Sequence, residues 1–96
     1  MPKVSIIVPV YDVAEYLRRC IDSCVYQTLA DIEVIIVNDS SPDNRDEVII
    51  SEYERNYPEK VRVFRHEKNL GLGEARNTAI QNAQGEFLLF CDSDDF

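Results

Sequence analysis

Four short apolar runs, spaced almost evenly along the chain, constrain its fold more than any other feature. They are Val4 to Val10, Ile32 to Val37, Val61 to Phe64 and Phe87 to Phe90, and their starts lie 28, 29 and 26 residues apart. That spacing fits a strand followed by a crossover helix. Near-continuous runs of this length, rich in β-branched residues, are typical of parallel strands that are covered on both faces.

Helical patterns fill the three gaps between the runs. Asp12 and Glu15 form a capping-box pair, Ser41 before Pro42 predicts the start of a second helix, and a third is predicted to begin near Gly73. The expected inward faces are Val13, Leu17, Cys20, Ile21 and Cys24, then Ile49, Tyr53 and Tyr57, then Leu72, Ala75, Ala79, Ile80 and Ala83. This alternation predicts one α/β domain over residues 1–96, with a mainly parallel four-stranded sheet.

Charge and hydropathy exclude several classes of protein. Ten Lys and Arg stand against eighteen Asp and Glu, for a net charge of −8, whereas a nucleic-acid partner requires a basic face. No apolar run is long enough to span a bilayer. The N-terminus lacks the pattern of a secretory signal, so we expect a cytoplasmic location. An acidic protein that binds a phosphorylated ligand would need a metal ion between the two.

The three cysteines, Cys20, Cys24 and Cys91, are expected to be reduced thiols, because the chain shows no export signal. Cys20 and Cys24 lie four residues apart on a predicted helix, which is a spacing that metal ligands also use. They share an apolar stripe with Leu17 and Ile21, however, and a single His leaves a zinc site short of partners. We therefore assign them to the core.

Distinctive residues follow each of the four predicted strands, at positions 9–12, 38–41, 68–71 and 92–95. In a parallel sheet these segments emerge at the same carboxyl edge, where open α/β sheets bind their ligands. Polar residues after one strand are ordinary. Four such segments together predict a binding site.

Asp92 and Asp94 are the strongest candidates for metal ligands. In an extended chain they share a face with Cα atoms about 6–7 Å apart, which suits one hard divalent cation, Mg²⁺ or Mn²⁺, held by oxygens. The oxygens of a diphosphate could complete its coordination. Taken alone, the motif fits a solvated acidic turn or a helix N-terminus equally well.

Three other residues at this edge could contact a ligand, and each has a simpler alternative. Asp39 could accept hydrogen bonds from a base or ribose, or could cap a turn. Tyr11 could stack on a base, or be a partly buried loop aromatic. Arg76 could meet an anion near a helix N-terminus, or be a solvated surface charge.

Other nucleotide-binding folds lack their required residues here. The G-x-G-x-x-G motif of dinucleotide-binding folds is absent after the first strand, and no G-x-x-x-x-G-K-[ST] phosphate loop occurs. The latter absence also argues against a metal-dependent nucleotidyltransferase. A receiver domain would need an acid after the third strand, where this chain has Asn69.

Taken in order, four segments closely resemble the family 2 glycosyltransferases of the GT-A fold. They are Ser5 to Tyr11, Ile35 to Ser41, Asn69 to Asn77 and Asp92 to Asp95, and the resemblance covers essentially the whole chain. It implies a Rossmann-like, three-layer α/β/α nucleotide-binding half with sheet order 3-2-1-4. It also implies a nucleotide-diphospho-sugar donor, usually UDP-linked, and transfer with inversion.

The resemblance assigns a base pocket to Pro9, Val10 and Tyr11, with Tyr11 against the uracil. Asp39 matches the aspartate that hydrogen-bonds the base. The chain departs from the family at Asn38, where an aspartate is usual.

The same resemblance assigns the diphosphate and metal sites. Arg76 matches the family arginine near the acidic motif and the diphosphate. Asp92, Ser93 and Asp94 form the D-x-D motif, in which Asp94 resembles the principal metal ligand and Asp92 is placed for ribose or metal contact.

Enzymes of this family need more chain after D-x-D than this sequence contains. We expect the general base downstream of Phe96, and therefore no catalytic residue among residues 1–96. The chain resembles a donor- and metal-binding half, truncated after the motif, of a polysaccharide-biosynthesis enzyme with a glycan or lipid-linked acceptor. The full-length parent could lie at the cytoplasmic face of the membrane.

Two further expectations follow from the apparent truncation. A non-catalytic nucleotide-binding or assembly module of the same fold is the alternative to an enzyme fragment. The sheet edge beside the fourth strand would be bare, and bare edges pair with other chains, so we expect a homodimer through that edge.

Overall fold

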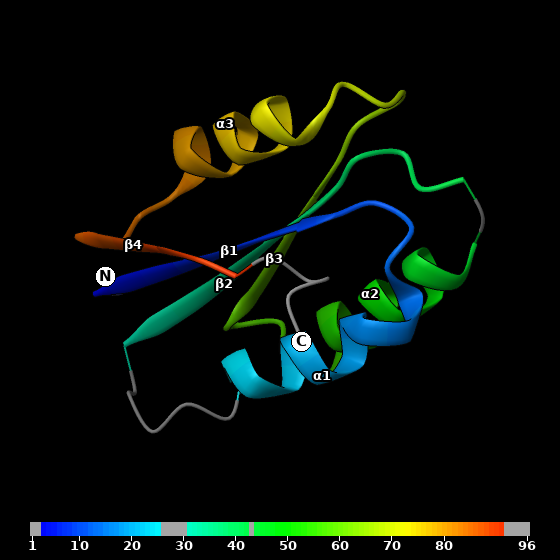
Figure 1. The fold of residues 1–96 in the computed structure, drawn as a ribbon. Coiled ribbons are helices and arrows are strands. Elements are labelled where there is room, and N and C mark those ends of the chain that lie inside the picture. Colours follow the sequence, from blue (N-terminus) through cyan, green and yellow to red (C-terminus); the bar gives the residue numbers. More distant parts are fainter. Residues whose placement is uncertain (1–2, 26–30, 43, 92–96) are drawn as a thin grey trace.

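Strands and helices alternate along the computed structural model, which describes residues 3–25, 31–42 and 44–91 (Figure 1). The elements are β1 (Val4–Val10), α1 (Ala14–Val25), β2 (Ile32–Asn38), α2 (Arg45–Asn56), β3 (Val61–Arg65), α3 (Leu72–Asn82) and β4 (Phe87–Phe90). Each strand begins at the predicted residue, because a segment rich in β-branched or aromatic residues begins there.

The four strands form one parallel sheet in the order β3-β2-β1-β4. Val4 of β1 lies opposite Ile32 of β2 on one side and Phe87 of β4 on the other. The predicted α/β class, the parallel strands and the strand order are confirmed. Parallel pairing brings the carboxyl ends of all four strands to one edge.

Helices cover both faces of the sheet, as the three-layer prediction requires (Figure 1). The larger apolar cluster lies between the sheet and helices α1 and α2, and it includes Val8, Leu17 and Ile50, none of which is exposed. On the other face, Ile7 packs with Ala75 and Ala79 of α3. Alanines on the inner face allow α3 to lie close to the sheet.

The two central strands are buried, whereas β4 is not. All of β2 is buried, but the four apolar side chains of β4 are 39–57% exposed. The sequence pattern predicted a strand covered on both faces here. The prediction is wrong for β4 because the described residues place it at the sheet edge, with β1 as its one neighbour.

The predicted capping box of α1 does not form. Asp12 has a φ of 53° and lies two residues before the first helical residue, Ala14. Asp46 Oδ2 instead accepts a hydrogen bond of 3.2 Å from the Val13 backbone N–H. The cap therefore comes from a residue 33 positions away, which a local pattern cannot reveal.

The second helix also begins later than predicted. It starts at Arg45 after Asn44, and Ser41 and Pro42 lie in the preceding loop. The Ser41 hydroxyl lies 2.7 Å from Asp46 Oδ2 and 2.9 Å from Asn38 Oδ1, so it ties the loop together and does not cap a helix.

The inner face of α3 is narrower than predicted. Ala75 and Ala79 are buried and Ala83 packs beside them, as expected. Leu72 is 51% and Ile80 is 42% exposed, so these two assignments are wrong.

The predicted core positions of Cys20 and Cys24 are confirmed, whereas Cys91 is only partly buried. All three cysteines are free. Among the described helices, none has both the length and the apolar character needed to cross a bilayer.

Candidate functional site

Backbone hydrogen bonds connect the four strands toward the carboxyl edge of the sheet, where the predicted site segments that the structure describes lie. They bridge β2 to β1, β3 to β2, and the end of β4 to β1. The three bonds run from Asp39 N to Val10 O (2.9 Å), from His66 N to Asn38 O (3.0 Å) and from Cys91 N to Ile7 O (2.8 Å).

Asp39 is the most constrained side chain at this edge, with 3% of its surface exposed. Its Oδ1 lies 2.7 Å from His66 Nδ1 and accepts the Leu70 N–H at 2.9 Å, while Oδ2 accepts the Gly71 N–H at 2.9 Å. Gly71 has a φ of 96°, in the left-handed region that favours glycine. The carboxylate therefore joins the end of β2 to the loop between β3 and α3.

The pKa of Asp39 lies below its ordinary value. Burial alone would raise the pKa, but the hydrogen bonds from His66, Leu70 and Gly71 outweigh it. Asp39 is thus a carboxylate at neutral pH, held by donors before any ligand arrives.

His66 is a site residue that the sequence analysis missed. Its second ring nitrogen, Nε2, lies 2.7 Å from Thr78 Oγ1 of α3, so the ring bridges Asp39 to that helix. The available signal was its position: it is the single histidine of the chain, and it directly follows the third strand.

The three predicted base-pocket residues differ in what they expose. Tyr11 is 48% exposed just beyond β1. Pro9 and Val10 are buried, and the Val10 side chain belongs to the core. Tyr11 thus presents a ring to a ligand, whereas Val10 can contribute only its backbone.

Asn38 has a structural role that explains why an amide, and not a carboxylate, stands at this position. Its Nδ2 donates to Glu47 Oε1 at 3.1 Å, and its Oδ1 accepts the Ser41 N–H at 3.1 Å. Arg65 also pairs with Glu47, and its hydrogen bonds are the main reason that the pKa of Glu47 is lowered. An aspartate at position 38 could not donate to Glu47 and would repel it.

Arg76 lies in the second turn of α3 and reaches the end of β4. Its guanidinium carbon is 5.6 Å from the centroid of the Phe90 ring, within the range of a cation–π contact. This contact places a positive charge beside the last residue of β4, two positions before Asp92.

Asp92, Ser93 and Asp94 lie outside the described residues, so their placement stays a prediction. Their carboxylate oxygens have the right chemistry for Mg²⁺ or Mn²⁺, and β4, which is parallel to β1, runs toward the edge where Asp39 lies. Across residues 3–25, 31–42 and 44–91, the one group of three metal-binding side chains is Cys20, Cys24 and Cys91. Its sulfurs are soft donors and do not suit these hard cations.

A hollow of about 560 Å³ lies between the first turns of α1 and α2. Its lining residues are Ala14, Glu15, Asn44, Arg45, Val48 and Ile49. None of these is a predicted donor-binding residue.

Comparison with protein families gives a match over nearly all of the chain. The model of the family described as Glycosyl transferase family 2 matches residues 5–96.

Curated relatives resemble the whole of this sequence. The uncharacterized glycosyltransferase EpsJ of Bacillus subtilis (strain 168) is 46% identical over all 96 residues, which are 27% of EpsJ. The chondroitin synthase of Pasteurella multocida (strain Pm70) is 43% identical over 96 residues, or 10% of that protein. The chain thus spans about a quarter or less of these relatives.

Solved structures share the fold. The S. aureus TarS 1–349 structure in complex with UDP-GlcNAc has a TM-score of 0.84 and 35% identity, covering 98% of this chain and 27% of that one. The mannosyltransferase PcManGT from Pyrobaculum calidifontis, in complex with GDP-Man and Mn²⁺, has a TM-score of 0.86 and 26% identity, covering 97% and 28%.

Proposed function

Because the chain belongs to glycosyl transferase family 2, we propose that it forms the donor-binding part of an inverting enzyme. That enzyme transfers a sugar from a nucleotide-diphospho-sugar, UDP-linked, to a hydroxyl of a glycan or lipid-linked acceptor. The observation that carries the proposal is Asp39, a buried carboxylate held by donors at the carboxyl edge between Tyr11 and α3.

The proposed contacts to the base use the groups that lie at the carboxyl edge of the sheet. The exposed ring of Tyr11 stacks on the uracil, and the backbone at Pro9 and Val10 forms the wall beneath it. Among the described residues Asp39 Oδ2 accepts one hydrogen bond, from Gly71. A carboxylate oxygen has two lone pairs, so Oδ2 can accept a second bond from a base N–H.

The diphosphate lies between Arg76 and the D-x-D motif. Arg76 contributes a positive charge near Phe90, and Asp94 and Asp92 hold Mn²⁺ or Mg²⁺, with Ser93 between them. When bound, the cation neutralises charge on the diphosphate and so helps the nucleoside diphosphate to leave. The positive charge of the cation is needed because both the diphosphate and the chain, with its net charge of −8, are negative.

The comparison structures support this choice of donor and metal. The TarS complex contains UDP-GlcNAc and is 35% identical, whereas the PcManGT complex contains GDP-Man with Mn²⁺ and is 26% identical. The higher identity favours a UDP-linked donor, and the second complex supports a divalent cation.

Residues 1–96 bind and orient the donor in this proposal. An acceptor hydroxyl attacks the anomeric carbon in line with the departing nucleoside diphosphate, which inverts that carbon. The general base that takes the hydroxyl proton is expected after Phe96. The isolated 96-residue chain should therefore bind a donor without turning it over.

Calorimetric titration with UDP, with and without Mn²⁺, tests the proposal. We expect binding that depends on Mn²⁺ and is abolished in Asp94→Ala. Glu59→Ala, which removes an exposed acid before β3, is the matched control and should bind like the original protein. Absence of binding at every Mn²⁺ concentration would contradict the proposal and favour a non-catalytic assembly module.

A further inference from the structure

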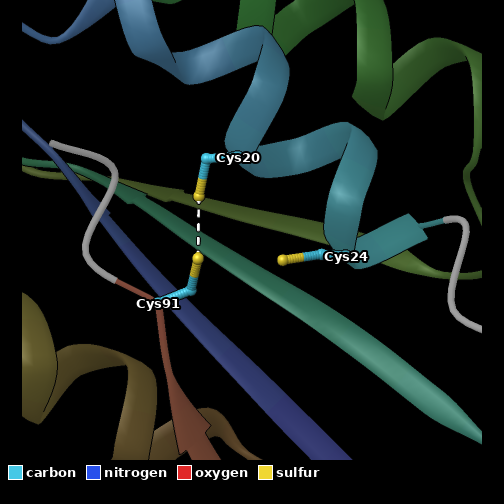
Figure 2. Close-up of side chains that lie close together, drawn as sticks. All are labelled: Cys20, Cys24 and Cys91. Carbon is cyan, nitrogen blue, oxygen red and sulfur yellow. Dashed lines mark hydrogen bonds between the residues drawn. The ribbon is translucent and has the colours of Figure 1, made fainter. Parts of the chain in front are cut away.

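Three cysteine thiols converge on the α1 face of the sheet (Figure 2). Cys20 and Cys24 project from α1, and Cys91 follows β4. All three sulfurs lie within 4.8 Å of one another, and those of Cys20 and Cys91 are 2.9 Å apart. The cluster joins positions 71 residues apart in sequence.

The scaffold holds all three thiols in place. Cys20 and Cys24 are four residues apart on one helix, so they share a face, and they are 0% and 3% exposed. The backbone of Cys91 is fixed to β1 by its hydrogen bond to Ile7 O. Cys91 is partly buried, which leaves the cluster a route to solvent.

We propose that Cys20, Cys24 and Cys91 form a binding site for a soft d¹⁰ metal ion, for which Cu(I) has the best-matched chemistry. Thiolates select soft ions such as Cu(I) over Mg²⁺ and Mn²⁺. No imidazole or carboxylate joins the group among the described residues. Cu(I) is satisfied by three sulfurs, whereas Zn²⁺ in structural sites takes four ligands.

The observed geometry needs a small adjustment to hold an ion. Metal–sulfur bonds of about 2.3 Å in a trigonal site place the sulfurs about 4 Å apart. The limit of 4.8 Å on the sulfur separations is compatible with this arrangement. The distance between the Cys20 and Cys91 sulfurs must increase by roughly 1 Å, and a rotation of either side chain can provide this change.

A bound ion would cross-link α1 to the residue after β4. The thiol protons leave to solvent as the sulfurs coordinate, so no oxidant or reductant is consumed. Because the ion binds the folded state, it should raise the Tm. The site is distinct from the hard-cation site proposed for Asp92 and Asp94, and its test does not require transferase activity.

Titration of the reduced, purified protein with Cu(I) under anaerobic conditions, against a competing chelator, tests the proposal. We expect one Cu(I) per chain, three sulfur neighbours by X-ray absorption and a higher Tm. Cys24→Ala and Cys91→Ala should each weaken binding by at least about 100-fold, since loss of outer-shell contacts alone costs 10–100-fold.

Arg19→Ala is the matched control, since it alters an exposed residue of the same helix without removing a sulfur, and it should bind Cu(I) like the original protein. Circular dichroism of the metal-free variants establishes that they fold. Unchanged Cu(I) affinity in a folded Cys24→Ala variant would overturn the proposal. So would a reduced protein that binds no Cu(I) and only forms a Cys20–Cys91 disulfide in air.

Discussion

Asp39 carries a charge that burial opposes and that three neighbours make tolerable. A buried carboxylate is costly unless hydrogen bonds replace water, and here His66 and two backbone N–H groups do so. Its place after the second strand was enough to single it out as a candidate from sequence. His66 was not identified, because nothing local to it signals that its ring bridges β2 to α3.

Glu33 lies near the amino end of β2, away from the carboxyl edge, and it allows the dependence of stability on pH to be tested. It lies 2.6 Å from the Ser5 hydroxyl oxygen and 3.0 Å from an Arg62 nitrogen, and accepts the Gln84 N–H. Burial raises its pKa, but these bonds outweigh that effect and leave the pKa lowered. Since the folded-state pKa lies below the unfolded value of about 4.3, the contribution of Glu33 is present above that pH and lost below it.

We therefore expect the free energy of unfolding, measured by urea denaturation, to fall as the pH is lowered from 5 through 4 to 3. In Glu33→Gln this fall should be shallower, because a group that binds protons differently in the two states has been removed. An equal or steeper fall in Glu33→Gln would contradict the assignment.

Two glycines give a matched pair of substitutions. A Cβ on Gly85 would lie 2.7 Å from both the backbone nitrogen and the hydroxyl oxygen of Ser5, whereas one on Gly73 would meet nothing within 4 Å. Gly85→Ala should destabilise the fold by about 1–3 kcal/mol through overpacking. Gly73→Ala, within α3, should stabilise it by roughly 0.5–1 kcal/mol. Urea denaturation measures both, and equal effects would contradict the geometry.

At the scale of elements, the sequence predicted strands better than helix ends. Each strand is a largely apolar segment that can be recognised from its own residues. The starts of α1 and α2 depend on contacts between distant residues, such as Asp46 with the Val13 N–H. Exposure also escaped prediction, because the apolar residues Leu72 and Ile80 of α3 and all of β4 need covering partners that local sequence does not specify.

The hydrogen bonds of Asp46 predict that replacing this residue destabilises the fold at the start of α1. Asp46 is 1% exposed, and its Oδ2 accepts from the Val13 N–H and the Ser41 hydroxyl. Asp46→Ala should lower the free energy of unfolding by about 2–4 kcal/mol, since it removes hydrogen bonds to a charged group and leaves the Val13 donor unpaired. Glu15→Ala, an exposed acid on α1, is the control and should change stability by about 0.5 kcal/mol or less.

For the whole molecule, β4 is one of the two edge strands of the described sheet and exposes apolar side chains. Such an edge tends to pair with another chain, so we predict a dimer of the 96-residue chain by light scattering. Leu89→Lys, on a residue 56% exposed, should return it to a monomer. Val48→Lys, equally exposed but on α2, is the matched control and should stay dimeric. A monomer at all concentrations would contradict this prediction.

The overall topology was predictable because the order of the segments identifies the GT-A fold, and the sheet order β3-β2-β1-β4 follows from that fold. The thiol cluster was not predictable from sequence, because it forms only when β4 positions Cys91 next to Cys20 of α1 in the folded chain. Contacts of this kind depend on side-chain positions in three dimensions, and the spacing of residues along the chain does not predict them.

We propose, above all, that the carboxyl edge of the sheet binds a nucleoside diphosphate through a hard cation. Paramagnetic broadening of backbone amide signals by Mn²⁺ in the presence of UDP tests it most directly, because the two edges are separated by strands up to seven residues long, about 23 Å. A site at this edge should give the strongest broadening at Tyr11, Asp39, Gly71 and Cys91, with Ser5, Glu33 and Gln84 least affected. Broadening centred on Ser5 and Glu33, or none that depends on UDP, would contradict it.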